Sequence, residues 1–239
     1  MKILIKDEAN IIKNSDIRWY LSDGSLWISK EETYQDVEKK ISEAIGSFNW
    51  LYNTNDTILF EKNSGKFILS IIGLSSDISI VENKIQFVCP KSTGDIFLND
   101  KNNSNFAFQG SIEYSGVHDY LLSCPEQYVI DSNICELSIT TDFSFYISDY
   151  SLVGWILKNA SKHLYISNTL YENVYDEKIQ ILLAEYLKIA RELEILEDEC
   201  EIYFKVNDLK KLFNVIDSIN DIRKEAIKEG ILAILEWYQ

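Results

Sequence analysis

The chain of 239 residues has few prolines, glycines, cysteines and histidines. With 2 prolines and 9 glycines it cannot be a collagen-like or proline-rich chain, and 4 cysteines are too sparse for a disulfide scaffold. The 2 histidines, His118 and His163, lie far apart in the sequence, so no pair has the spacing of metal ligands. We therefore expect neither a resident metal nor a cofactor.

Long apolar runs and targeting signals are also missing. A signal peptide needs about 7 to 15 consecutive apolar residues and a membrane-spanning helix about 20, whereas the apolar run at the N-terminus covers residues 3–5. The cysteines form no Cys-x-x-Cys pair; they are Cys89, Cys124, Cys135 and Cys200. These features predict a cytoplasmic protein with reduced thiols and no membrane partner.

Positive charge is scarce. Lys and Arg number 23 against 38 Asp and Glu, which gives a formal net charge of -15. Such a surface repels nucleic acid and anionic membranes, so neither is expected as a partner. The composition, with 46% apolar and 26% charged residues, is that of a folded globular protein of one or two domains.

Sequence motifs that define a reaction are not found. The chain has no Gly-x-Ser-x-Gly, no P-loop motif and no Gly-x-Gly-x-x-Gly, which excludes serine-nucleophile elbows and nucleotide-binding loops of these types. An enzyme is an alternative through His118, Asp119 and Cys124, because a cysteine nucleophile needs a base within hydrogen-bond reach. Nothing in the sequence marks Cys124 as activated, and we predict a binding protein without catalytic residues.

The first 168 residues show short apolar alternations separated by Asn, Asp, Ser and Gly, a pattern typical of antiparallel strands and hairpins. The clearest predicted hairpin joins residues 57–60 to residues 67–72 through a turn that contains Asn63 and Gly65. The other predicted strands are residues 79–81 and 84–89, which form a second hairpin, and residues 106–114, 128–130, 136–139 and 143–147.

Two helices are predicted within this β-rich part. Residues 30–47 carry apolar residues at helical spacing, and Ser29 with Glu32 forms a capping box in front of them. Residues 151–160 are predicted to form a short helix.

From residue 169 onward the apolar pattern becomes helical. A first long helix carries the apolar stripe of residues 179–196, with Thr169 as its N-cap, and a second begins at Asn207 or Asp208 and is broken near Ser218. The predicted fold class is therefore α+β, with strands first and helices last. We divide the chain into a β-rich domain at residues 1–168 and a helical C-terminal region at residues 169–239 that packs on it, with a single compact unit as the alternative.

Residues 102–157 contain no Lys or Arg, although about five would be expected at the overall frequency of the chain. The same segment is rich in acids and aromatic residues. Aromatic side chains anchor protein interfaces and charges steer association, so this segment is a candidate binding surface. The alternative is that its aromatics are core residues of strands and its acids are their exposed neighbours. The candidate partner-binding residues here are Glu113, Tyr114, Asp119, Tyr120, Glu126, Tyr128 and Asp131.

A second acidic cluster lies at residues 192–201, at the predicted C-terminal end of the first long helix. The helix dipole favours cations at that end, and like charges within about three turns repel one another. The cluster is therefore either a solvated face balanced by nearby lysines or a second contact for a basic partner. Glu194, Glu197 and Asp198 are its candidate binding residues.

The acidic balance and the hairpin segment Thr57-Ile-Leu-Phe-Glu-Lys-Asn-Ser-Gly-Lys-Phe-Ile-Leu69 resemble, in general style, the bacterial immunity proteins that neutralise a cognate toxin. The resemblance implies a cytoplasmic protein that occludes the cationic active site of a toxin, for example a nuclease. Alternatives are another bacterial or phage binding or scaffold protein, a mimic of nucleic acid and, with less support, an enzyme. The sequence leaves the partner and the oligomeric state open.

Overall fold

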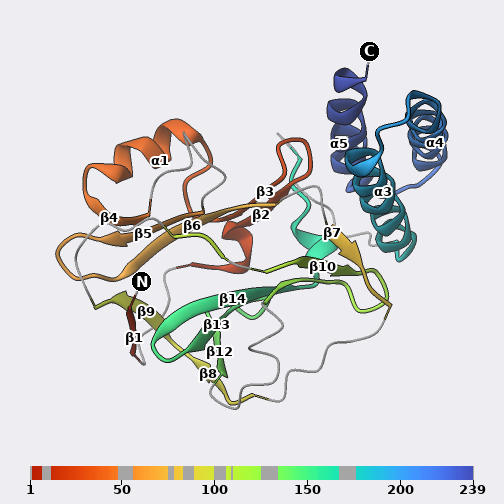
Figure 1. Cartoon of the computed structure of the whole chain (residues 1–239). Helices are drawn as coiled ribbons and strands as arrows, with labels where there is room; N and C mark the ends of the chain where they lie inside the picture. The colour runs from red at the N-terminus through yellow and green to blue at the C-terminus, as the bar shows by residue number, and fades with distance from the viewer. Residues whose placement is uncertain are drawn as a thin grey trace.

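The computed structural model describes residues 2–6, 12–47, 56–74, 78–82, 89–99, 106–108, 110–124, 134–166 and 176–238. These residues form two large β-sheets that lie one above the other, a small third sheet, one early helix and a group of C-terminal helices (Figure 1). The α+β class is thereby confirmed, since the strands and the early helix precede the C-terminal helices along the chain.

The first large sheet has five antiparallel strands and contains the predicted hairpin at residues 57–72. Gly65 closes the turn of this hairpin with a positive φ of 74°, a conformation that favours glycine. In spatial order the strands are β2 (Ile17–Tyr20), β3 (Ser25–Ile28), β6 (Phe67–Gly73), β5 (Thr57–Glu61) and β4 (Ala44–Ser47).

The second large sheet has seven strands and is mixed. In spatial order they are β7 (Ile78–Ile80), β10 (Ile112–Ser115), β11 (Tyr120–Ser123), β14 (Ser151–Lys158), β13 (Phe143–Ser148), β12 (Ile134–Ser138) and β8 (Lys91–Thr93). The two edge pairings, β7 with β10 and β8 with β12, are parallel, and the other pairings are antiparallel.

Among the described residues, the β-rich part also contains a small ribbon and two 3-10 turns. β1 (Ile3–Lys6) pairs with β9 (Asp95–Leu98) in a separate antiparallel ribbon. Two 3-10 turns, η1 (Asn14–Asp16) and η3 (Ala160–His163), precede β2 and follow β14 respectively.

The inner faces of the two large sheets share one apolar core. Aromatic rings meet across it, with centroids 5.7 Å apart for Phe67 and Phe145 and 5.9 Å apart for Trp19 and Tyr114. On the outer face of the five-stranded sheet, α1 (Tyr34–Ile41) buries Val37 in a cluster that includes Leu59 and Leu69 (Figure 1).

The early helix is shorter than the predicted range of residues 30–47. Its N-cap is Thr33, whose hydroxyl accepts a hydrogen bond from the Asp36 amide at 3.2 Å, so the predicted capping box at Ser29 is wrong. The later residues of the range form β4, which pairs with β5. A Cβ at Gly46 would lie 2.0 Å from the Ile58 carbonyl oxygen, so the two strands approach closely at this glycine.

The predicted short helix at residues 151–160 is also wrong, because residues 151–158 form strand β14 in the middle of the seven-stranded sheet. A central strand is buried on both faces, and its apolar run has no period that separates it from a buried helix. Trp155 and Leu157 belong to the inner core, whereas Val153 and Ile156 belong to a second cluster on the outer face.

The other predicted strands are confirmed only in part. Strands are confirmed within residues 136–139 and 143–147, and the strand expected at residues 106–114 begins only at Ile112. Of the second predicted hairpin, the structure describes β7, whose partner is β10. Residues 83–88 and the predicted strand at residues 128–130 lie outside the described residues.

The C-terminal helices are α3 (Lys178–Ile195), α4 (Glu199–Asp217) and α5 (Lys224–Trp237), which we call the helical unit. The predicted break near Ser218 is confirmed, because α4 ends at Asp217. α4 begins eight or more residues before the predicted caps Asn207 and Asp208, since Asp198 caps it instead. The predicted cap Thr169 lies outside the described residues.

The helical unit packs against the side of the β-rich part that carries β7 and β10 (Figure 1). Leu183 and Tyr186 of α3 belong to the same buried cluster as Trp19 and Tyr114 of the sheets. The sheets and the helical unit therefore share a continuous apolar core.

A buried polar network fixes this contact. Arg223, at the start of α5, donates to both carboxylate oxygens of Asp221, at 3.0 Å from Nε to Oδ1 and 2.7 Å from Nη2 to Oδ2. It also donates from Nη1 to the Ser161 hydroxyl of η3 at 2.8 Å and from Nη2 to the Asp176 carbonyl at 3.1 Å. The Ser161 hydroxyl in turn donates to Asp119 at 2.8 Å. We call these residues the Arg223 network.

The Arg223 network is almost inaccessible to water, with Arg223 and Asp221 both nearly fully buried. Burial raises the pKa of Asp221, but the hydrogen bonds from Arg223 and from the backbone outweigh burial and hold this pKa below its ordinary value. Two buried charges are tolerated because each satisfies the other.

Replacing Arg223 should therefore strongly destabilise the fold. We expect Arg223→Met to lower the free energy of unfolding by about 3–5 kcal/mol, because it leaves the Asp221 carboxylate buried without its counter-charge. The double variant Arg223→Met/Asp221→Leu should recover part of this loss. Urea denaturation measures both, with Lys210→Ala, an exposed cation in the same helical unit, as a control that changes stability by less than about 0.5 kcal/mol. A loss below about 1 kcal/mol for Arg223→Met would contradict the role of the network.

Asp56, at the start of β5, is also a buried carboxylate, but unlike Asp221 it has a raised pKa. It accepts hydrogen bonds from the amides of Gly73 at 3.1 Å and Phe108 at 2.6 Å. Burial raises its pKa to about 6, and these two backbone hydrogen bonds offset burial only in part.

Because the pKa of Asp56 is higher in the folded than in the unfolded chain, its contribution to stability is greatest below about pH 4 and is lost as pH rises through about 6. Through Asp56, the wild-type protein should lose about 2–3 kcal/mol of its free energy of unfolding between these pH values. Asp56→Asn should not show this loss, because its side chain does not ionise. The measurement is the difference between wild-type and variant free energies of unfolding at pH 4, 5, 6 and 7. A difference that stays constant with pH would show that Asp56 titrates normally.

Candidate functional site

The described residues bring together few groups that could catalyse a reaction. Within them no three His, Cys, Asp or Glu side chains form a metal-binding group. His118 and Cys124 lie at opposite ends of β11, so they do not form the thiol and base pair considered from the sequence. Burial raises the pKa of Cys124 to about 11, which keeps this thiol protonated at neutral pH.

Across the described part of the chain, no helix is long and apolar enough to span a membrane.

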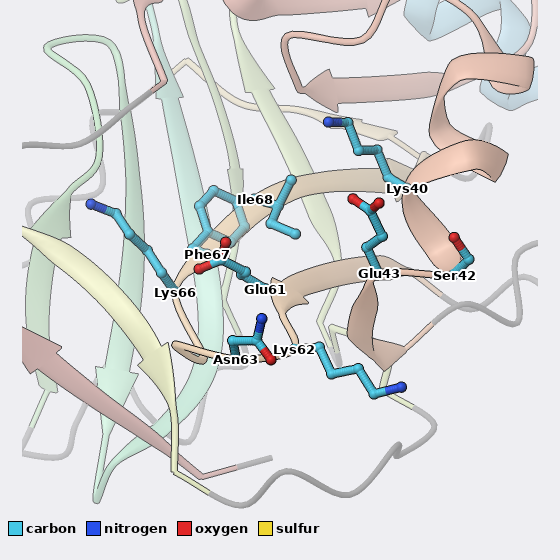
Figure 2. A pocket seen from close by; sticks show the side chains of 9 residues that line it. All are labelled: Lys40, Ser42, Glu43, Glu61, Lys62, Asn63, Lys66, Phe67 and Ile68. Carbon is cyan, nitrogen blue, oxygen red and sulfur yellow. The ribbon is translucent and has the colours of Figure 1, made fainter.

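A cavity of about 750 Å³ opens beside the β5–β6 hairpin (Figure 2). Its lining mixes Lys40, Lys62 and Lys66 with Glu43 and Glu61. In Figure 2 the side chains of Lys62 and Lys66 extend to opposite sides of the hairpin.

Three of the charged side chains at this cavity are engaged with the protein itself. Lys66 pairs with the buried Asp95 at 3.4 Å, Lys40 pairs with Glu31 at 3.6 Å, and the Ser64 hydroxyl donates to Glu61. Three lysines and two glutamates line the cavity, a difference of one charge, so the lining has no strong charge of one sign to select a ligand. We do not assign a function to it.

The candidate residues from the segment without Lys or Arg are mostly part of the interior. Tyr114 and Tyr120 are buried on strands β10 and β11. Asp119 is buried in the turn between them, where its carboxylate accepts from the Ser161 amide at 2.9 Å and from the Ser161 hydroxyl. These three side chains stabilise the fold and do not form an exposed surface, because the two rings pack in apolar clusters and the carboxylate is bound by Ser161.

The remaining residues of that group contribute little to a surface that the structure describes. Glu113 is half-buried on β10. Glu126, Tyr128 and Asp131 lie outside the described residues.

The second acidic cluster, in contrast, is exposed and lies where three helix ends meet. The last turn of α3 is followed after three residues by the first turn of α4. The end of α5 joins them, because the Tyr238 hydroxyl donates to the Leu193 carbonyl at 3.2 Å. Glu194, Glu197 and Asp198 are all exposed at this junction.

Large apolar side chains are exposed at the same junction. The exposed fractions are 65% for Tyr203, 66% for Phe204 and 88% for Trp237, and the rings of Tyr203 and Phe204 contact each other with centroids 6.0 Å apart. We name this set the helix-end surface. It consists of the apolar residues Ile195, Tyr203, Phe204, Trp237 and Tyr238 and the exposed acids Glu194, Glu197, Asp198, Glu199, Glu201 and Glu236.

The helix-end surface lies away from the sheets. The C-terminus of the chain is at the end of the helical unit that points away from them (Figure 1). The Arg223 network holds the other end, near the start of α3, and a helix of 18 residues spans about 27 Å. The surface is therefore accessible to a partner without any change in the sheets.

The acids at this junction are not all at a helix C-terminus, which corrects the sequence interpretation. Asp198 is the N-cap of α4, and its carboxylate accepts from the amides of Cys200 at 2.9 Å and Glu201 at 3.0 Å. Glu199 and Glu201 lie in the first turn of α4, where the helix dipole favours negative charge. The fold thus stabilises part of an acidic cluster that, from the sequence, was expected to lie at a helix C-terminus, where negative charge is unfavourable.

Positive charge near the cluster is limited. Residues 192–204 contain no Lys or Arg. Lys205 forms an ion pair with Glu192, and this hydrogen bond raises the pKa of Lys205 above its ordinary value. The pair joins α3 to α4, and the carboxylates of the helix-end surface remain exposed to solvent.

Sequence reasoning missed the aromatic half of this surface. Tyr203 and Phe204 fall outside the stripe of buried residues on α4, which includes Val206, Leu209 and Leu212. A helix that began at Glu199 would have placed both rings off the apolar face. That signal was lost because α4 was expected to begin at residue 207 or 208.

Comparison with models of protein families, with curated proteins and with solved structures found no match for this chain.

The exposed aromatics should contribute little to folding. We expect the double variant Tyr203→Ala/Trp237→Ala to change the free energy of unfolding by less than about 1 kcal/mol, because both side chains are mostly in solvent. Phe143→Ala, which removes a fully buried ring, should lower it by about 3–5 kcal/mol under the same conditions. Urea denaturation compares the two. A loss above about 2 kcal/mol for the double variant would mean that these rings serve the fold.

Proposed function

We propose that this protein binds a basic protein partner through the helix-end surface and blocks the activity of that partner. The observation that carries the proposal is the coincidence of exposed aromatic rings with exposed carboxylates at one junction of three helices. Exposed Trp and Tyr side chains favour association, because rings of this size bury much apolar area when a partner covers them.

The chemistry of the surface selects the partner. Its carboxylates, in a chain of net charge -15, attract a cationic protein and raise the rate of encounter. A toxin with a cationic substrate groove, such as a nuclease, fits this description, since carboxylates can occupy the places of phosphates. The general likeness to immunity proteins supports the same interpretation, with action in the cytoplasm.

The aromatic rings favour an inhibitor anchored by apolar contacts over the alternative of a nucleic-acid mimic that binds its protein partner by charge alone. A mimic needs negative charge but gains nothing from rings exposed at 65% to 88%. Protein interfaces, in contrast, are enriched in Tyr, Trp and Phe at their centres.

The test is affinity capture from a cytosolic extract of the source organism at low salt, followed by elution with a salt gradient. Wild-type protein should retain one basic protein in equimolar amount. Tyr203→Ala/Trp237→Ala should weaken its binding by at least about a hundredfold, because interface aromatics contribute 2 kcal/mol or more each. The purified partner should lose its own activity when wild-type protein is added and keep it when the double variant is added.

Matched controls separate the surface from general effects. Tyr150→Ala removes an aromatic ring exposed at 68% in the β13–β14 turn and should leave binding unchanged.

Glu194→Gln/Glu197→Gln/Asp198→Asn should slow association and flatten its salt dependence, and Asn at position 198 keeps the helix cap. The variant Glu38→Gln/Glu177→Gln/Glu229→Gln changes the net charge equally at exposed sites elsewhere and should bind like wild type. Equal binding by the two triple variants, or a partner that is itself acidic, would contradict the proposal.

A further inference from the structure

A second cavity, distinct from the helix-end surface, lies between the sheets and the helical unit. It has a volume of about 240 Å³ and is lined by the β2–β3 turn, by Leu74 and Ile78 at the ends of β6 and β7, and by α3 and α5. Its walls are mainly apolar, with Trp19 on the sheet side and Leu187 and Ile234 on the helix side.

Tyr186 of α3 brings a hydroxyl group to this mainly apolar lining. Its side chain is 4% exposed, and among the described residues its hydroxyl has no hydrogen-bond partner. Burial raises the pKa of Tyr186, so the hydroxyl stays protonated. The hydroxyl oxygen is not fully shielded from solvent, so it is available to a molecule in the cavity, and tyrosine hydroxyls in protein interiors usually have a partner.

The backbone makes room for this hydroxyl. A Cβ at Gly230 of α5 would lie 2.6 Å from the Tyr186 hydroxyl oxygen and 3.0 Å from the Leu21 Cβ. Glycine at this position therefore lets α5 approach while the hydroxyl stays beside the cavity. Any larger residue would force the Tyr186 ring to move.

The size and polarity of the cavity restrict its ligand. An apolar cavity of about 150 Å³ can hold benzene, so 240 Å³ accommodates a substituted single ring or a small bicyclic molecule. Ordered water needs two to four polar partners, and among the lining side chains only Trp19, Asp23 and Tyr186 carry polar atoms. Asp23 lines the cavity as well, and its carboxylate already accepts from the hydroxyls of Ser25 at 2.6 Å and Tyr34 at 3.4 Å. A negative charge there disfavours an anionic ligand.

We propose that this cavity binds a small neutral aromatic molecule that carries one hydrogen-bonding group, with the ring against the apolar walls and the polar group on the Tyr186 hydroxyl. Binding should tighten the contact between the helical unit and the sheets, since the ligand would touch both.

The experiment titrates the full-length protein with three probes of one shape, p-cresol, toluene and p-toluate, by calorimetry and by thermal unfolding. Wild-type protein should bind p-cresol about tenfold more tightly than toluene, because toluene leaves the hydroxyl unpaired. It should not bind the anion p-toluate measurably. p-Cresol should also raise the unfolding temperature.

Two variants test the geometry. Tyr186→Phe should bind p-cresol and toluene with equal affinity, because the hydrogen-bonding group is gone and the cavity remains. Ala190→Leu, which fills the cavity from α3, should bind neither probe while its unfolding temperature without ligand stays at or above that of wild type. If Ala190→Leu does not fold, the comparison of Tyr186→Phe with wild type decides alone.

Two results would overturn the proposal. The first is the absence of p-cresol binding to wild type at concentrations up to about 1 mM, which would leave water as the occupant. The second is a preference for p-cresol over toluene that Tyr186→Phe retains, which would place the binding elsewhere.

Discussion

The buried pair of Arg223 and Asp221 is the contact on which the placement of the helical unit depends. An ion pair taken out of water is tolerated only in the arrangement that satisfies all of its hydrogen bonds. Here that arrangement includes the Ser161 hydroxyl and the Asp176 carbonyl, which belong to the sheet side and to the start of α3. Apolar packing alone would allow several dockings of an amphipathic helix, whereas this network specifies one.

Fixing the helical unit at one end leaves the opposite end free for binding. The helix-end surface stands a helix length away from the network, and the junction that forms it is held by the Asp198 cap and the Tyr238 hydroxyl. Its acids are partly stabilised by the α4 dipole, so the fold tolerates a concentration of negative charge that a partner can use. The cavity of about 240 Å³ that Tyr186 lines lies between these two ends, where a bound molecule would touch both the sheets and the helices.

Local sequence patterns predicted the α+β class, the hairpin at residues 57–72 and the break at Ser218, because turn residues and apolar periods act over a few residues. They failed for β14, whose burial on both faces is a consequence of its central place in the sheet. Asp119 and Asp198 show that local sequence patterns also fail to predict which acidic side chains are buried and which are exposed. Both acids lie outside helices and strands, yet Ser161, distant in sequence, draws Asp119 inward, whereas the start of α4 keeps Asp198 at the surface.

The most direct test of the account is photocrosslinking from the helix-end surface in living cells of the source organism. A benzoylphenylalanine placed at position 237 should form a covalent adduct with a single basic protein, since Trp237 belongs to the helix-end surface and is 88% exposed. The same group at position 150, on the β13–β14 turn, should form no such adduct. Crosslinking of that protein from position 150 and not from position 237 would contradict the account.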